Sequence, residues 1–141
     1  MNTSTKIVNQ MLEKDAFSKW LGIEVLSVSK GYCQLKMKVR EEMLNGFYIA
    51  HGGIAYSLAD SALAFASNSN GKQSLSIETS ISHTMAIKGG DELIATTEEV
   101  SVSNKFAVYI IIIKNNDNHI IAHFKGTVYR TSTNWIVENN E

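Results

Sequence analysis

The hydrophobic pattern of this chain is dominated by one stretch near its middle. Residues 45–71 carry small and apolar side chains around most of a helical circumference, and glycine and asparagine residues stand at both ends of the stretch. The apolar positions are Ile54, Ala55, Leu58, Ala59, Ala62, Leu63, Phe65 and Ala66. An apolar helix of about 16 residues is too short to cross a bilayer, so we expect protein to surround it.

The segments around this helix show the period-two alternation of β-strands. Residues 31–39 place Cys33, Leu35 and Met37 on one face and polar side chains on the other. The run at 108–113 is continuously β-branched and aromatic, which is typical of a strand buried on both faces. The predicted strands are 23–29, 31–39, 74–84, 92–103, 108–113 and 119–131, and an amphipathic helix is predicted at 5–18.

The order of these elements predicts an α+β fold. One curved antiparallel sheet wraps around the long helix, and the second helix lies at the N-terminus. We expect one domain over residues 1–141, with its core at about 17–131 and a loosely attached tail at 132–141. A single sheet leaves an edge strand and an outer face uncovered, and the apolar run at 108–113 indicates that a second copy covers them. The sequence therefore predicts a homodimer.

Composition narrows the class of protein. The formal net charge of −1 gives no reason to expect nucleic acid or an anionic membrane as a partner. The sequence shows no signal-like or transmembrane segment, so we expect a cytoplasmic protein. The lone Cys33 has no companion for a disulfide. The spacing of His83, His119 and His123 does not suit a metal, so we predict no metal site and assign these residues structural or solvent roles.

One carboxylate stands out on the apolar helix. Asp60 has no cationic residue three or four positions away in either direction. A helical aspartate more often lies on a solvent-facing stripe, and Asn45 and His51 taken alone fit a turn residue and a core histidine equally well. An ionisable group on an apolar helix is costly unless it is paired or used, which makes Asp60 a candidate functional residue.

The spacing of these residues resembles that of one enzyme family. Asn45-Gly46, His51-Gly52-Gly53 and Asp60 form the pattern N-G-x4-H-G-G-x6-D, and Asn68 to Gly71 close the helix. This pattern is similar to that of the hotdog-fold acyl-CoA thioesterases. It looks most like the branch that acts on phenylacetyl-CoA-type thioesters in aromatic degradation. The similarity runs from about Phe17 to Arg130.

The resemblance implies a hotdog dimer, which pairs again as a dimer of dimers, and a set of site residues. It assigns the catalytic carboxylate, as nucleophile or general base, to Asp60. It assigns the groups before and at the start of the helix to Asn45, His51 and Gly52, and a water-assisting residue on the next strand to Ser76. The N–H of Gly52, at a helix N-terminus, could donate to the thioester carbonyl.

The resemblance also implies contacts to coenzyme A, which is part of the substrate, so no separate cofactor is expected. The candidates for these contacts are Gly53, Lys88, Asn104 and Lys105. For the two lysines, an ordinary solvated role is an equally good interpretation. The chain has Met85-Ala86 where many relatives carry Arg-Pro.

Helix geometry constrains how such a site is built. Gly52 and Asp60 are eight positions apart, which at about 1.5 Å per residue separates them by about 12 Å along one helix. One carbonyl group cannot touch both residues of a single chain. If both act on one thioester, the carboxylate must come from a second subunit, so we expect a site shared by the dimer.

Three functions remain open from the sequence. The first is hydrolysis of an acyl-CoA with a small aromatic (phenylacetyl- or hydroxyphenylacetyl-type) or medium-chain acyl group to the free acid and CoA. The second is a hotdog enoyl or hydroxyacyl thioester hydratase-dehydratase with His51 as the main base. The third is a non-catalytic acyl-CoA-binding protein. The presence of Asp60 together with Asn45 favours hydrolysis, since a binding protein has no use for a buried carboxylate.

Overall fold

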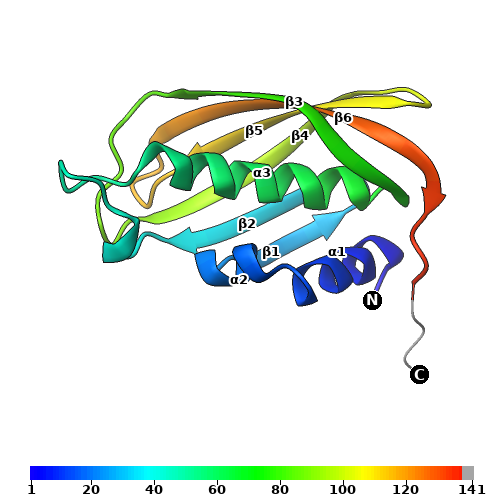
Figure 1. Ribbon diagram of the computed structural model, residues 1–141, viewed down its shortest axis with the longest axis horizontal. Helices are drawn as coiled ribbons and strands as arrows, with labels where there is room; N and C mark the ends of the chain where they lie inside the picture. Colours follow the sequence, from blue (N-terminus) through cyan, green and yellow to red (C-terminus); the bar gives the residue numbers. More distant parts are fainter. Residues whose placement is uncertain (138–141) are drawn as a thin grey trace.

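The computed structural model describes residues 1–137 and shows one antiparallel sheet curled around a long central helix, as predicted. Figure 1 shows α3 in the middle, with α1 and α2 beneath it. The elements are α1 (Thr3–Glu13), α2 (Ala16–Leu21), β1 (Glu24–Ser29), β2 (Tyr32–Lys38), the 3-10 helix η1 (Glu41–Met43), α3 (Gly52–Asn68), β3 (Lys72–His83), β4 (Glu92–Val102), β5 (Phe106–Lys114) and β6 (Ile120–Asn134).

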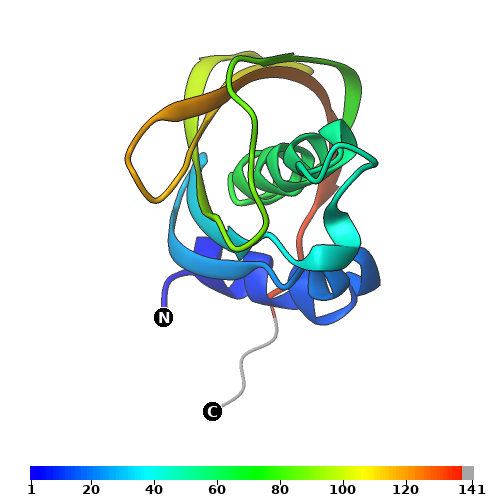
Figure 2. The ribbon, with the colours of Figure 1, turned by 90° about the vertical axis from the view of Figure 1, so that its left-hand side faces the viewer.

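The six strands lie in the order β1-β2-β4-β5-β6-β3, with every neighbouring pair antiparallel. Viewed along α3, the sheet curls around the helix and the N-terminal helices close the open side (Figure 2). The strand order leaves β1 and β3 as the two edges. Since β3 follows α3 directly and runs back along it, this edge lies beside the helix (Figure 1).

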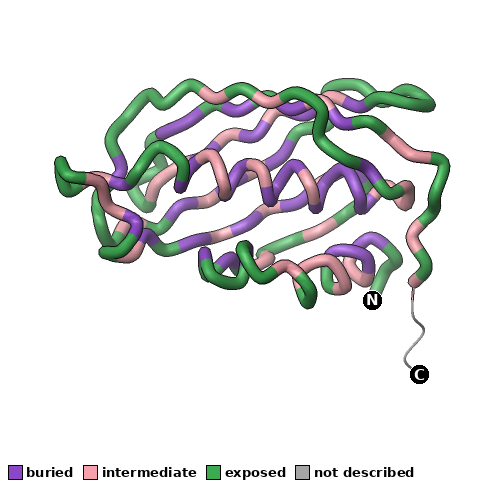
Figure 3. Tube along the Cα trace, in the orientation of Figure 1, coloured by how far each residue is buried: buried purple, intermediate pink, exposed green. Residues whose placement is uncertain are grey.

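The core forms between the inner face of the sheet and the buried faces of α3. Cys33, Leu35 and Met37 of β2 are buried, as the alternation predicted. Figure 3 shows the resulting band of buried residues along α3 and the strands that cover it. The closest approach is at Gly126 of β6, where an added Cβ would overlap the side chain of the fully buried Leu63. No helix in the described part of the chain is long and apolar enough to span a membrane.

The N-terminal region differs from the single helix predicted at 5–18. It forms two helices, α1 and α2, which are separated at Lys14 and Asp15. The physical reason is the side chain of Asp15, which accepts a hydrogen bond from the main-chain N–H of Ser18 and so caps a new helix. Aspartate in a helix interior competes with the backbone in this way, which favours a break over continuation.

The run at 108–113 is not buried on both faces within one chain. In β5 the residues Tyr109, Ile111 and Ile113 are buried, whereas Val108, Ile110 and Ile112 alternate with them and are half-buried on the outer face. Burial of this apolar outer face by a second copy, which the sequence predicts, stays a prediction.

The C-terminal segment also differs from the prediction of a loose tail beginning at residue 132. Strand β6 continues to Asn134, and the indole Nε1 of Trp135 donates a 2.9 Å hydrogen bond to Asn68 Oδ1 at the end of α3. The main-chain N–H of Trp135 donates to the carbonyl of Gly71. The last part of the predicted tail, residues 138–141, lies outside the described residues.

We predict that Gly126→Val destabilises the protein by about 1–3 kcal/mol, the usual cost of overpacking a core. The new side chain would overlap the end of the buried Leu63 side chain, which would have to shift to make room. Urea unfolding measures the change. Gly46→Val is the matched control, because no atom lies within 4 Å of a Cβ placed there. Equal losses in the two variants would contradict the tight helix–sheet contact.

Candidate active site

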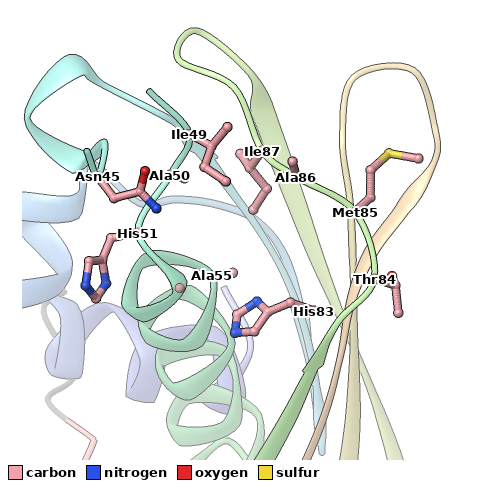
Figure 4. A pocket seen from close by; sticks show the side chains of 11 residues that line it. Asn45, Ile49, Ala50, His51, Ala55, His83, Thr84, Met85, Ala86 and Ile87 are labelled. Atoms are coloured by element: carbon pink, nitrogen blue, oxygen red, sulfur yellow. The ribbon is translucent and has the colours of Figure 1, made fainter. Parts of the chain in front are cut away.

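A pocket of about 430 Å³ lies at the N-terminal end of α3. The loop before the helix, its first turn and the segment that follows β3 form its walls (Figure 4). Four polar side chains line this mostly apolar pocket: Asn45, His51, His83 and Thr84, whose hydroxyl already donates to the carbonyl of Ile120. Figure 4 shows the two imidazoles on opposite sides of the first turn of α3. The structure therefore brings together Asn45, His51 and Gly52, as the sequence pattern suggested.

The start of α3 offers hydrogen-bond donors. The His51 Nδ1 accepts a 3.1 Å bond from the N–H of Gly53, which caps the helix. The N–H of Gly52 has no hydrogen-bond acceptor within the described residues. A free N–H at a helix N-terminus, where the helix dipole is positive, suits an oxygen that carries negative charge.

The side chains beside Gly52 are oriented as donors too. A neutral His51 whose Nδ1 accepts a hydrogen bond carries its proton on Nε2, so its outer nitrogen is a donor. The Oδ1 of Asn45 accepts a 2.9 Å bond from the main-chain N–H of Phe47, which leaves the NH2 group of Asn45 for other contacts. The pocket thus presents donors from Asn45, His51 and Gly52 at one end.

The sequence analysis missed His83, which it assigned a structural or solvent role. His83 is the last residue of β3 and is exposed in the pocket. A Cβ added to Gly52 would lie 3.4 Å from its Nε2, so the imidazole packs directly against the helix entrance. No local sequence pattern indicates this position, because it depends on β3 returning along α3 to the helix N-terminus.

Asp60 lies two turns further along α3, outside this pocket. It lines a separate hollow of about 160 Å³, together with Ser76 of β3. The structure therefore brings Asp60 and Ser76 together but keeps both apart from Asn45, His51 and Gly52. Their catalytic roles stay predictions.

The carboxylate of Asp60 is half-buried and has no hydrogen bond or ion pair within the described residues. Burial raises the pKa of Asp60 above its ordinary value, and the negative charge of Asp15 raises it further. A carboxylate with a raised pKa holds a proton more strongly than a solvated one, so Asp60 is suited to accept a proton in a reaction.

The candidate residues for coenzyme A contacts do not form one cluster within the chain. The N–H of Gly53 is already bonded to His51. Lys88 lies near the pocket, bridged to Ile49, whereas the β4–β5 turn with Asn104 and Lys105 lies at the other end of the molecule (Figure 1). The Oδ1 of Asn104 accepts a 3.2 Å bond from Lys72. Within a single chain, one ligand molecule therefore cannot contact both Lys88 and the turn that carries Asn104 and Lys105.

Comparison with known proteins identifies the family. The sequence model of the family described as "Thioesterase superfamily" matches residues 47–122. The chain belongs to the thioesterase superfamily. It is 42% identical over 127 residues to a putative esterase of Archaeoglobus fulgidus. The alignment covers 90% of this chain and 82% of that relative. It is 37% identical over 120 residues to the acyl-coenzyme A thioesterase PaaI of Escherichia coli, covering 85% of this chain and 86% of that protein.

The solved structures agree. The structure of the E. coli PaaI protein from the phenylacetic acid degradation operon superposes with a TM-score of 0.90 at 34% identity, over 94% of this chain and 99% of that one. The predicted hotdog fold is thereby confirmed for this thioesterase. The buried helix of the sequence pattern is α3; the donors at its start line one pocket, and the carboxylate of Asp60 in its middle lines another hollow.

We predict that Asp60→Asn raises the melting temperature near pH 7. Because the folded-state pKa of Asp60 is raised, the residue contributes stability below its unfolded-state pKa and loses that contribution as the pH rises through the folded-state pKa. Asparagine carries no charge at any pH. The difference in Tm between variant and wild type should therefore shrink as the pH is lowered toward about 4, near the ordinary carboxyl pKa.

Differential scanning fluorimetry at several pH values measures this effect. Asp117→Asn, at an exposed position in the β5–β6 turn, is the control for removal of one negative charge. A melting temperature of Asp60→Asn that stays below wild type throughout would show that the carboxylate is a stabilising group.

Proposed function

We propose that this thioesterase hydrolyses an acyl-CoA to the free acid and CoA, with a small aromatic (phenylacetyl- or hydroxyphenylacetyl-type) or medium-chain acyl group. The relationship to an acyl-coenzyme A thioesterase, whose structure comes from the phenylacetic acid degradation operon, supports this substrate class. The polar end and apolar walls of the pocket fit it as well. The observation that carries the proposal is the separation of the donors at Gly52 from the carboxylate of Asp60.

A two-fold axis halfway between these groups would bring them together from two subunits. The midpoint between Gly52 and Asp60 on α3 is Tyr56, whose hydroxyl is hydrogen-bonded to Thr79 of the edge strand β3. An axis through this point exchanges the two ends of the segment, so Gly52 of one subunit meets Asp60 of the other. The same operation pairs β3 with its copy in antiparallel fashion, centred near Thr79.

The exposed edge of the sheet supports this arrangement. Strand β3 pairs with β6 on one side only, and Leu75 and Ile77 are 68% and 58% exposed. An unpaired strand with exposed apolar side chains is a template for another chain, and antiparallel pairing with a second copy would satisfy its free N–H and C=O groups. With Thr79 at its centre, this pairing would place Ser76 of the partner subunit opposite Ser82, the residue before His83 at the end of β3. The axis therefore brings Ser76 of the partner subunit toward His83, beside the pocket.

In this shared site the thioester carbonyl accepts hydrogen bonds from the N–H of Gly52 and from neighbouring donors. Asp60 of the partner subunit acts as nucleophile or as general base. As a base, it takes a proton from a water molecule whose oxygen forms a bond to the carbonyl carbon. The C–S bond then breaks, and the CoA thiolate takes a proton from the same carboxyl group, while the Nε2–H of His51 can donate a hydrogen bond to the sulfur. Ser76 of the partner subunit lies beside the carboxylate, where it can hold the water.

The alternatives receive less support. A hydratase with His51 as its main base needs a ring nitrogen free to accept a proton, but Nδ1 accepts from Gly53 and Nε2 carries the proton of the neutral ring. A protein that only binds acyl-CoA has no use for an unpaired, half-buried carboxylate. We further propose that the half-buried outer face of β5 pairs two dimers, and that the enzyme acts in the cytoplasm in phenylacetate degradation.

We predict that the purified protein releases free thiol from phenylacetyl-CoA and hexanoyl-CoA faster than from palmitoyl-CoA. Asp60→Asn should lose about 100-fold or more in kcat, the scale expected when a catalytic acid–base group is removed. A thiol-reactive dye follows the reaction, and Asp117→Asn controls for the lost charge. Wild-type turnover in Asp60→Asn would remove Asp60 from the mechanism, and no thiol release from any acyl-CoA would overturn the proposed function.

We also predict that two inactive variants complement each other. One is Asp60→Asn, and the other carries Asn45→Ala and His51→Ala. In a mixed population about half of the dimers are heterodimers, and each heterodimer holds one intact site and one doubly altered site. Activity should therefore recover to about a quarter of wild type. A mixture as inactive as its components, after subunit exchange has been shown by mass spectrometry, would place the catalytic groups within one chain.

A further inference from the structure

A hydrogen-bond chain ties the N-terminal helices to α3 next to the reacting carboxylate. The carboxylate of Asp15 accepts from the Ser18 N–H at 2.9 Å and from the Ser18 hydroxyl at 2.6 Å. The Ser18 hydroxyl also lies 2.8 Å from that of Ser61, the residue after Asp60. Both serines are buried, with exposed fractions of 1% and 9%.

The direction of this chain follows from the chemistry of its last member. An ionised carboxylate accepts hydrogen bonds and donates none, so Ser18 must donate its hydroxyl proton to Asp15. The oxygen of Ser18 is then left as the acceptor for the hydroxyl of Ser61. The hydroxyl of Ser61 thus donates to Ser18, and that of Ser18 donates to Asp15. This chain holds the carboxylate of Asp15 against the turn of α3 that carries Asp60.

The charges around Asp60 are unbalanced. The residues of β3 and β6 that share its hollow are Ser74, Leu75, Ser76 and Val128, and none of them carries a charge. The same holds for its neighbours on α3 in that hollow, Leu63, Ala64 and Ser67. From the N-terminal helices, the carboxylate of Asp15 is tied through Ser18 to Ser61, the residue after Asp60, and its negative charge adds to burial in raising the pKa of Asp60. In the proposed dimer, His51 and His83 of the partner subunit face it from the opposite side.

We propose that Asp15 is a positioning residue for thioester hydrolysis, held against α3 through Ser18 and Ser61 so that its negative charge strengthens Asp60 as a proton acceptor. This inference rests on the proposed function, in which Asp60 reacts. A nearby negative charge favours proton uptake, and a stronger base takes a proton from water more readily. Asp15 itself touches no reacting atom.

Experiment can separate this electrostatic role of Asp15 from a purely structural one. Asp15 also caps α2, and asparagine caps helices about as well as aspartate. Asp15→Asn therefore removes the charge and keeps the cap. Asp117→Asn removes one negative charge from the exposed β5–β6 turn and is the matched control. Asp15→Glu restores the charge.

The test is the dependence of kcat/KM on pH for hydrolysis of the best acyl-CoA substrate. In Asp15→Asn we expect the acidic limb to move to lower pH and the plateau to fall several-fold, well short of the loss in Asp60→Asn. The activity of Asp15→Asn relative to wild type then rises as the pH falls. Asp15→Glu should restore the acidic limb, and the profile of Asp117→Asn should superpose on that of the wild type. A loss by the same factor at every pH would overturn the inference.

A titration of Asp60 by carboxyl-carbon NMR separates this inference from the proposed function. We expect Asp60 to titrate at lower pH in Asp15→Asn than in the wild type. An unchanged titration overturns the inference, even in an enzyme that hydrolyses acyl-CoA. A lowered titration in a protein that hydrolyses no acyl-CoA overturns the proposed function and supports the effect of Asp15 on Asp60. If Asp15→Asn does not fold, Ser61→Ala breaks the same chain, and the same shift in a smaller amount is expected.

Discussion

The burial of α3 inside a single curved sheet is the constraint on which the rest of this structure depends. A helix covered on most sides by strands keeps its N-terminus open at one end of the molecule, and there no group within residues 1–137 accepts a hydrogen bond from the N–H of Gly52. The helical rise then fixes how far any later residue lies from that N–H. A carboxylate two turns along cannot reach the same oxygen, whatever its rotamer. The proposed division of the site between two chains rests on this distance.

The sequence predicted features that depend on one helix or strand, but it did not predict contacts between elements that are far apart in the chain. The apolar circumference of residues 52–68 and the glycines at its start were enough to predict α3. The resemblance carried by the pattern N-G-x4-H-G-G-x6-D predicted the group of Asn45, His51 and Gly52. His83 enters the pocket only because β3 returns along α3, and no local spacing records that path. Asp15 looked like one more polar residue of an amphipathic helix. Its effect on Asp60 depends on a contact between residues 43 positions apart, from Ser18 to Ser61.

The apolar pattern of the strands is compatible with two kinds of burial. A run such as Val108 to Ile113 is compatible with burial against the core of its own chain or against another copy, since both surfaces exclude water from apolar side chains. Within the described chain the outward members of β5 are only half-buried, and Leu75 and Ile77 of β3 are exposed. Hydrophobic periodicity reports the total burial of a residue and does not say which chain supplies it. A surface that a second copy covers therefore has the same sequence pattern as a strand buried in the core of its own chain.

In the proposed reaction the two ends of this part of α3 meet opposite demands. The donors at the start of α3 must stabilise negative charge on the thioester oxygen, whereas Asp60 must remain a good proton acceptor. Within its own chain Asp60 lies two turns from those donors, so their hydrogen bonds and the positive end of its own helix do not act directly on it to lower its pKa. The middle of α3 provides no such donors, and Asp15 adds a negative charge. A thioester placed between the subunits then separates the two functions: its carbonyl oxygen meets the donors of one chain, and the attacking water meets the carboxylate of the other.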